Sequence, residues 1–299
     1  MDEYKLAAFD MDGTLLNSEK RVSENTKQAI RAAIDAGKYI VIATGRAVSE
    51  CEDCAEDLEP IRFSVCESGA VVYDRHAKRI LYRTGFKKEL ADVILDIGTQ
   101  FDTMPYVLSL GEAVAEKGSL EHLDYYHMSV YRGMMSRVCV LTKNLPAKFH
   151  STGRGIEKIN FYCASAEVRE EVRRHLEPLS EDITVAFAEE TSIEISPKGL
   201  TKAAGLSWLC GRLGIRPQEV IAAGDADNDR DMLAFAGLSA AMGNAPERIR
   251  RECGIVVRDN DHDGCCDVIR CLMEEIPSKN PGKKILKKRK KAVDNGKTP

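Results

Sequence analysis

Two carboxylates flank a methionine directly after a short apolar run near the start of the chain. In the stretch AAFDMDGTLLNS, Asp10 and Asp12 follow a predicted buried strand at residues 5–9 and precede a turn at residues 13–14. Two negative charges at this spacing repel each other, and a turn would be satisfied by one aspartate. The pair therefore indicates a place where a cation binds or a reaction occurs.

Three later loops, each behind a predicted apolar strand, carry polar groups in the same way. They contain the sequence TGR at residues 44–46, Lys202 at a predicted helix start, and the acidic run GDADND at residues 224–229. In a parallel sheet the carboxyl ends of the strands share one edge, so we expect the loops to meet there. Carboxylates suit Mg²⁺, while a lysine, a hydroxyl and backbone N–H groups suit phosphate oxygens. The set predicts a phosphoryl-transfer site.

The composition limits the class of protein. The chain has 299 residues, 43% of them hydrophobic and 30% charged, and a net charge of −4, which is typical of a globular protein of about two domains. This small charge gives no reason to expect nucleic acid as a partner. We expect no signal peptide, and no segment has the roughly 18 apolar residues of a membrane span. The ten cysteines are expected to be reduced thiols in the cytoplasm.

The elements around the polar loops predict an α/β fold. Ser23 is expected to cap a helix that runs to about Ala36, with Gly37 directly after it. Apolar strands alternate with helices before residue 84 and again from about residue 192. Nearly continuous apolar strands in this alternation predict a Rossmann-like parallel sheet.

The stretch between Thr84 and Ala188 is less regular, with a helix expected near 87–97, a strand at KINFYCA and a helix at AEVREEVRRHLEPL. We therefore predict an inserted α/β cap domain at 84–188 within a discontinuous core at 1–83 and 189–276. The basic tail at 277–299 is expected to be disordered, with a nuclear-localisation or polyanion-binding patch as the alternative.

In chain order, DMDGT, TGR, a lysine after SPKG, and GDADND resemble the haloacid dehalogenase-like superfamily of phosphatases. An insert between the second and third motifs is similar to its Cof-type branch, which has a large α/β cap. AMGNA at 241–245 and DNDHDG at 259–264 also match phrases common in that branch. The resemblance extends to about residue 276. It implies an Mg²⁺-dependent phosphatase that hydrolyses small phosphorylated metabolites, a sugar phosphate or a related phosphomonoester, through an aspartyl phosphate.

The resemblance also implies a role for each matched residue. Asp10 would be the nucleophile, and Asp12 the general acid and later the base. The Asp10 carboxylate, the Asp12 backbone carbonyl and Asp225 would bind Mg²⁺, and Asp229 would orient these ligands. A further set would hold the phosphoryl oxygens, namely Thr44, Gly45, Lys202 and Asn228.

Other functions stay open on the same residues. A phosphotransferase or phosphomutase would use the same site, and a phosphate-binding protein without catalysis would keep the fold. A membrane ion pump with this nucleophile is excluded by the lack of spans. We expect a small-molecule phosphate ester as the partner, and neither nucleic acid nor a membrane. The oligomeric state is open.

Some single positions have two interpretations. Lys198 competes with Lys202, which we prefer because a helix start directs its side chain and N–H groups together. Arg46 is expected to lie at the surface or behind the ligand-binding groups. Ser68 stands where the family often has the asparagine of an NGA sequence, so any substrate contact at this position is in doubt.

Two thiol patterns could suggest a metal. Cys51 and Cys54 form a Cys-x-x-Cys pair in an acidic stretch, where we expect structural thiols rather than a zinc or redox site. His262 with Cys265 and Cys266 is expected to contribute to helix packing.

Overall fold

The computed structural model describes residues 3–187 and 190–274, which form two compact units. The first unit combines Met1–Val41 with Cys210–Pro299, and the second is Ile42–Leu209. The predicted basic tail lies outside the described residues, and the predicted domain boundaries stay a prediction. No helix in the described part is long and apolar enough to cross a membrane.

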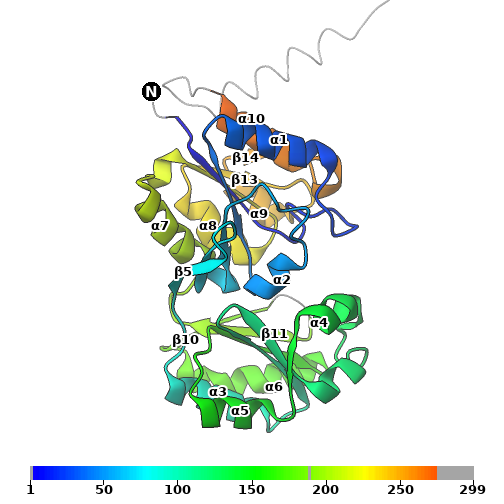
Figure 1. Cartoon of the computed structure of the whole chain (residues 1–299). Coiled ribbons are helices and arrows are strands. Elements are labelled where there is room, and N and C mark those ends of the chain that lie inside the picture. The colour runs from blue at the N-terminus through cyan, green and yellow to red at the C-terminus, as the bar shows by residue number, and fades with distance from the viewer. Residues whose placement is uncertain (1–2, 188–189, 275–299) are drawn as a thin grey trace, which may run out of the picture. The chain divides into compact units, whose positions relative to one another are not determined.

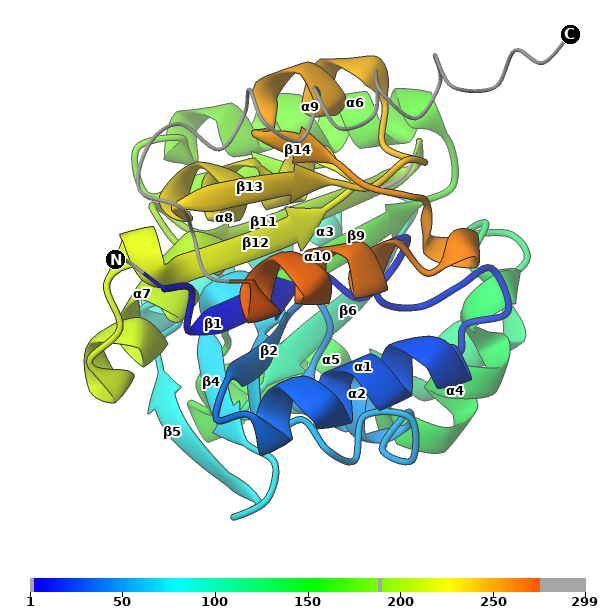
Figure 2. The same ribbon diagram turned by 90° about the horizontal axis from the view of Figure 1, so that it is seen from above.

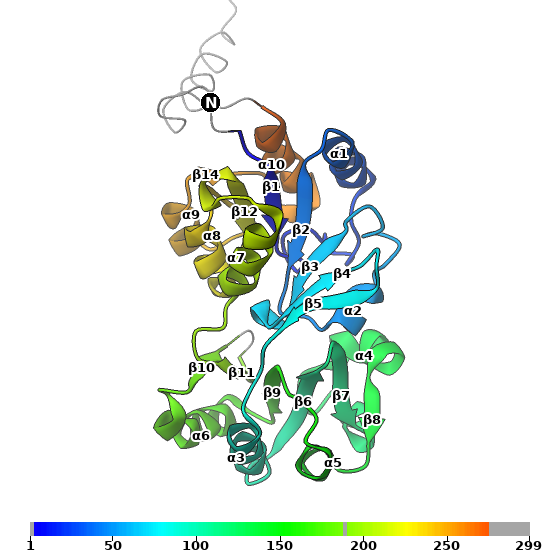
Figure 3. The same ribbon diagram turned by 60° about the vertical axis from the view of Figure 1, so that its left-hand side comes forward.

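The first unit contains a parallel sheet with the strand order β14-β13-β12-β1. Its elements are β1 (Leu6–Phe9), α1 (Glu24–Asp35), β12 (Val220–Gly224), α8 (Arg230–Phe235), β13 (Leu238–Ala241), α9 (Glu247–Glu252), β14 (Ile255–Val256) and α10 (Gly264–Met273). Figure 2 shows β12, β13 and β14 side by side, and α8 and α10 lie on opposite sides of β12 in Figure 3. The predicted parallel α/β sheet is confirmed.

The strands and helices of this unit form for the reasons that the sequence suggests. Every residue of β1 and of β12 is buried, as continuous apolar strands require. The Ser23 hydroxyl accepts a hydrogen bond from the backbone N–H of Thr26, and α1 ends before Gly37, which has a positive φ of 80°. Helices α1 and α10 pack side by side (Figure 1), as expected for the thiol-containing helix.

The second unit begins with short strands and one helix. Strands β3, β4 and β5 pair in antiparallel order, and β2 and α7 run across the division between the units. The bounds are β2 (Tyr39–Ala43), α2 (Val48–Glu52), β3 (Phe63–Cys66), β4 (Val71–Asp74), β5 (Arg79–Arg83) and α7 (Lys202–Leu213). Helix α7 begins at Lys202, which the sequence placed at a predicted helix start.

The rest of the second unit is built on a six-stranded sheet with the order β10-β11-β9-β6-β7-β8. Its pairs are antiparallel except for β7 with β8. The elements are α3 (Lys88–Gly98), β6 (Thr103–Ser109), β7 (Glu112–Glu116), α4 (Arg132–Val138), β8 (Val140–Thr142), α5 (Leu145–Thr152), β9 (Lys158–Cys163), α6 (Ala166–Leu176), β10 (Ile183–Ala186) and β11 (Ser192–Pro197). Helices α3, α5 and α6 cover one face of this sheet (Figure 3). The sheet extends past residue 188, because β11 pairs with β9.

Gly69 occupies a position that only glycine fits. Its φ is +103°, and a Cβ there would lie 1.9 Å from the backbone oxygen of Thr201 at the start of α7. Gly199 shares the positive φ, at +74°, but has open space around it. The two glycines separate the cost of the backbone conformation from the cost of the clash.

We expect Gly69→Ala to lower the free energy of unfolding by more than Gly199→Ala does. The conformation alone costs about 1–2 kcal/mol, and in Gly69→Ala the backbone at Thr201 must also move. Urea unfolding of both variants measures the difference. Equal losses would show that the loop adapts and that the close approach to α7 has no cost.

Candidate active site

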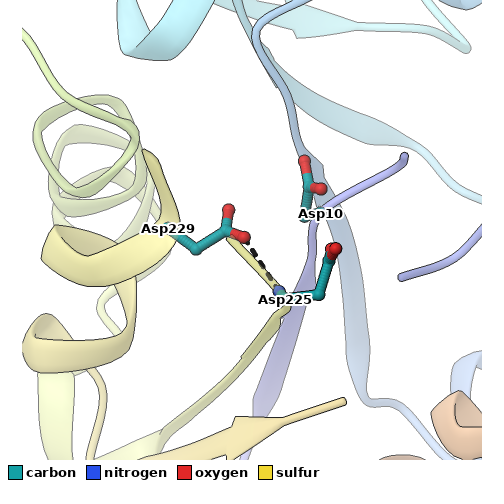
Figure 4. A group of neighbouring side chains, drawn as sticks. All are labelled: Asp10, Asp225 and Asp229. Carbon is teal, nitrogen blue, oxygen red and sulfur yellow. Dashed lines mark hydrogen bonds between the residues drawn. The ribbon is translucent and has the colours of Figure 1, made fainter. Parts of the chain in front are cut away.

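Three carboxylates from separate places in the chain converge in the first unit (Figure 4). One oxygen each from Asp10, Asp225 and Asp229 lies within 4.8 Å of the others. Asp10 follows β1 and Asp225 follows β12. The two strands are parallel neighbours, with Phe9 opposite Ala223, so their carboxyl ends coincide. The convergence predicted for Asp10, Asp225 and Asp229 is therefore present.

Backbone N–H groups and missing side chains make this crowding possible. Asp229 is fully buried, and its Oδ2 accepts hydrogen bonds of 3.0 Å from the N–H groups of Asp225 and Ala226. A Cβ on Gly224 would lie 2.6 Å from Asp229 Oδ2, and one on Gly13 would lie 2.4 Å from Asp225 Oδ2. Both glycines thus leave room for carboxylates.

The donor set fits a hard divalent cation. It consists only of carboxylate oxygens, which Mg²⁺ prefers, and the Asp229 contacts to the backbone fix the peptide that carries Asp225. Within residues 3–187 and 190–274 this is the one group of three or more His, Cys, Asp or Glu side chains whose ligand atoms lie close enough to share an ion. Cys51, Cys54 and His262 belong to no such group of three or more side chains in the described part of the chain.

The other predicted residues of this unit lie at the surface. Asp12 is partly exposed, and its Oδ1 accepts a hydrogen bond of 2.9 Å from the Lys20 ammonium. Thr14 was not among the predicted residues. It is buried, and its hydroxyl donates a hydrogen bond to Asp225 Oδ1 at 2.8 Å. Asn228 is exposed in the 3-10 turn Asp227–Asp229 that precedes α8. The structure thus brings together three of the predicted acidic residues and leaves Asn228 open to solvent.

The two phrases near the carboxyl end of the first unit hold the loop behind Asp12. Asn244, in AMGNA, donates from Nδ2 to the Gly13 carbonyl at 2.8 Å, and Asn260, in DNDHDG, donates to the Leu16 carbonyl at 3.0 Å. Asp261 accepts hydrogen bonds from the hydroxyl and the N–H of Ser18, which lower the pKa of its carboxyl group. These residues position the loop rather than react.

Thr44, Gly45 and Lys202 belong to the second unit. Thr44 is buried directly after β2, where its carbonyl accepts from the N–H of Ser68 at 3.0 Å and its hydroxyl from the N–H of Arg46 at 3.2 Å. Lys202 is buried at the first position of α7. Lys198 is exposed and donates from Nζ to the Ser180 carbonyl. Burial at a helix start favours Lys202 over Lys198 for an interaction with phosphate.

Two residues that the sequence did not single out lie beside Ser68. Lys158 is buried in β9, and its Nζ donates to the Ser68 hydroxyl at 3.1 Å and to Glu194 Oε2 at 2.7 Å. Glu67 is fully buried, and burial raises the pKa of its carboxyl group well above the usual range. A lysine at the first position of a largely apolar, buried strand was the available signal for Lys158.

Residues 67–69 have unusual backbone conformations. Glu67 and Ser68 have positive φ values of 54° and 56°, and Gly69 follows at 103°. Consecutive non-glycine residues in this region cost about 1–3 kcal/mol each, and such strain gathers at binding sites. Ser68, which stands where the family often has an asparagine, thus lies in a strained loop and accepts a hydrogen bond from Lys158.

Several cysteine side chains lie in buried positions. All ten cysteines are unbridged, and Cys51 lies with its sulfur 3.7 Å from that of Cys66 in a buried position. The hydrogen bond with Cys66 and burial raise the pKa of the Cys51 thiol, which disfavours a reactive thiolate. Cys265 donates to the Thr14 carbonyl, and Cys266 lies 3.6 Å from the Thr26 hydroxyl. These contacts attach α10 to the rest of the first unit.

Comparison with known proteins gives consistent matches over most of the chain. The family model for haloacid dehalogenase-like hydrolases matches residues 7–269. The 5-amino-6-(5-phospho-D-ribitylamino)uracil phosphatase YcsE of Bacillus subtilis is 28% identical, over 90% of this chain and 95% of its own length. The HMP-PP phosphatase of Klebsiella pneumoniae is 30% identical, over 83% and 87%. The crystal structure of a haloacid dehalogenase-like hydrolase from Bacteroides thetaiotaomicron aligns with a TM-score of 0.78 at 27% identity, over 90% and 99%.

We expect Mg²⁺ to raise the melting temperature of the protein, because an ion that binds only the folded state stabilises it by about 2.7 kcal/mol at a hundredfold excess over Kd. Asp225→Asn should lose most of this shift, since it removes a charge from the carboxylate cluster. Thermal denaturation with increasing Mg²⁺ measures it.

Asp35→Asn is the matched control, because Asp35 is exposed on α1 in the same unit and lies outside the cluster. It should keep the shift of the unmodified protein. Equal Mg²⁺ shifts in the Asp225 and Asp35 variants would contradict binding at the cluster.

Proposed function

The chain belongs to the haloacid dehalogenase-like hydrolase family, and we propose that it is a Mg²⁺-dependent phosphatase that acts on small phosphorylated metabolites through an aspartyl phosphate. The observation that carries this proposal is the convergence of Asp10, Asp225 and Asp229 at the carboxyl ends of β1 and β12. Three carboxylates this close favour a bound cation, and a nucleophile beside a cation suits an anionic phosphate ester.

Asp10 is the proposed nucleophile. Its carboxylate oxygen attacks phosphorus, the bond from phosphorus to the ester oxygen breaks, and an aspartyl phosphate forms. The leaving alkoxide takes a proton from Asp12, which then accepts a proton from the water that attacks the aspartyl phosphate. Phosphate leaves and Asp10 is regenerated.

The exposure of Asp12 suits it to act as general acid and then as general base. Its side chain is 38% exposed, so Asp12 can exchange protons with solvent, and its Oδ1 accepts a hydrogen bond from the Lys20 ammonium. Asp229 is proposed to position Asp225 through the two backbone hydrogen bonds. When bound by Asp10, Asp225 and the Asp12 carbonyl, Mg²⁺ supplies positive charge against the phosphoryl oxygens.

The remaining predicted residues supply hydrogen bonds and charge to the phosphoryl group in this proposal. Lys202 offers an ammonium at a helix start and Thr44 a hydroxyl, and both are buried, which strengthens their interaction with an anion. The N–H of Gly45 and the amide of Asn228 would complete this set.

The proposed substrates are phosphate monoesters of small metabolites. Two of the similar proteins are named as phosphatases of a phosphoribitylamino-uracil and of HMP-PP, which share a phosphorylated small molecule and little else. The ten unbridged cysteines support action in the cytoplasm, where thiols stay reduced.

Asp10→Asn should abolish turnover, because the amide keeps the shape of the side chain but not its nucleophilicity. Asp12→Ala should lower turnover by about 10²- to 10⁴-fold, since it removes the general acid and base. With p-nitrophenyl phosphate, whose leaving group hardly needs a proton, the first step should partly survive and the phosphoenzyme should accumulate. Mass spectrometry of acid-quenched Asp12→Ala protein detects the added phosphoryl group on Asp10.

Asp35→Asn, an exposed position on α1, is the control and should turn over normally without an adduct. Release of p-nitrophenol by Asp12→Ala with no adduct on Asp10 would refute the proposed roles. Turnover by Asp10→Asn at the unmodified rate would refute the nucleophile.

A further inference from the structure

Glu67 of the second unit is a buried carboxyl group without a hydrogen-bond partner. Its side chain is fully buried, and neither Oε1 nor Oε2 has a partner among the described residues. The buried carboxyl groups of Glu50 and Glu157, in the same unit, each accept hydrogen bonds at both oxygens. An ionised Glu67 would lose its hydration without a compensating donor, so the fold favours the neutral acid at this position.

The charged groups around Glu67 also oppose its ionisation. Three groups that carry a negative charge when ionised act against it, namely Glu157 before β9, Cys66 in β3 and Glu50 in α2. Lys158 acts in the opposite direction, but its ammonium is paired with Glu194 Oε2 at 2.7 Å. The charge of Arg46, from the loop that contains TGR, acts on Glu50 and Cys51. Burial, followed by the like charges, raises the pKa of Glu67 well above the usual range.

The backbone of Glu67 connects this side chain to the loop that contains TGR. The N–H of Glu67 donates to the Arg46 carbonyl at 2.9 Å, and the N–H of Ser68 donates to the Thr44 carbonyl at 3.0 Å. The two carbonyl groups flank Gly45 in the sequence. Glu67 and Ser68 make these contacts at positive φ values of 54° and 56°, a strained conformation that persists only while the surroundings hold it. A change at Glu67 therefore reaches the residues proposed to hold the phosphoryl group.

We propose that Glu67 is a positioning residue that has to remain neutral, so that its ionisation in alkaline solution releases residues 67–69 from the TGR loop and weakens phosphate binding. The part of this inference that concerns phosphate rests on the proposed phosphatase function. Ionisation gives one proton to solvent and leaves a carboxylate where no donor faces it. The carboxylate then moves toward water, and the strained residues around it move with it.

The pH dependence has a defined sign. Because the pKa of Glu67 is higher in the folded protein than in the unfolded chain, the stabilisation by its neutral form is complete below the ordinary glutamate pKa of about 4.3. This stabilisation is lost as the pH rises toward the raised pKa. One proton is released, so the ratio of folded to unfolded protein falls by at most about tenfold for each pH unit in this window.

Glu67→Gln tests the proposal, because glutamine has the shape of the neutral acid and cannot ionise. In urea unfolding of the full chain from about pH 5 to about pH 9, the variant should lose less stability than the unmodified protein, by up to about tenfold in the folding equilibrium constant per pH unit. Groups that titrate in both proteins cancel in this comparison. Glu67→Met has a similar length, also cannot ionise and should behave in the same way if glutamine is not tolerated.

Hydrogen exchange detected by mass spectrometry measures the opening of the loop without a substrate. As the pH rises, the peptide that contains residues 63–69 should exchange increasingly faster in the unmodified protein than in Glu67→Gln, while a peptide from α3 should not differ. With Mg²⁺ and p-nitrophenyl phosphate, the unmodified protein should lose kcat/KM more steeply with pH than the variant, mainly through KM. Glu89→Gln, exposed on α3, is the control and should follow the unmodified protein in all three measurements.

The outcomes separate this inference from the function of the site. If no protein releases phosphate from the ester, the phosphatase function is wrong, and unfolding with hydrogen exchange still decides the role of Glu67. If the stabilities of the unmodified protein and of Glu67→Gln change with pH in parallel, the inference is wrong. A difference in stability without faster exchange at residues 63–69 would show that Glu67 does not hold the loop, which also overturns it.

Discussion

Three negative charges within 4.8 Å of one another constrain the whole first unit. Such a group repels itself unless other parts of the chain stabilise it, and the fold does so mainly with backbone. Asp229 accepts two N–H groups of the loop after β12, glycines at 13 and 224 leave the space that the carboxylates fill, and the parallel register of β1 with β12 places the two strand ends side by side. The strands and their loops thus hold like charges close together, and a bound cation would reduce the repulsion between them.

The second unit handles buried charge in a different way. Several of its buried polar groups are paired with one another: Lys158 of β9 with Glu194 of β11, Arg83 of β5 with Glu157, and the Tyr106 hydroxyl of β6 with Glu50 of α2. Burial raises the pKa of both Glu50 and Glu157, which shows that desolvation outweighs the favourable contacts of these carboxyl groups. A polar network of this kind fixes the positions of its members closely, because each lost partner leaves another group unsatisfied.

Local patterns predicted the parts of the fold and site that depend on local chemistry. The apolar runs before Asp10 and Asp225, the cap at Ser23 and the helix start at Lys202 all appear as expected. The pairing of Lys158 with Glu194 could not be predicted, because it depends on which strands pair and in what register. Strand β11 pairs with β9 although α6 and β10 separate the two strands in the sequence. The hairpin between β6 and β7 turns at Leu110 and Gly111, both with positive φ, and lacks the Asn-Gly or Asp-Gly sequence that usually indicates such a turn.

The hydrogen bonds that hold the loop behind Asp12 join residues 231 to 251 positions apart, as between Asn244 and Gly13 or Cys265 and Thr14. Contacts of such sequence separation form slowly, because a long loop must close before they bring any gain. During synthesis, the segment with Asp10 emerges first. It cannot form these contacts until β12, the loop at Asn244 and α10 have been synthesised. The second unit, which is continuous, has no such delay. The connectivity of the chain thus sets the order in which the parts of the structure form. The proposed nucleophile Asp10 acquires its surroundings only after almost all of the described chain has been made.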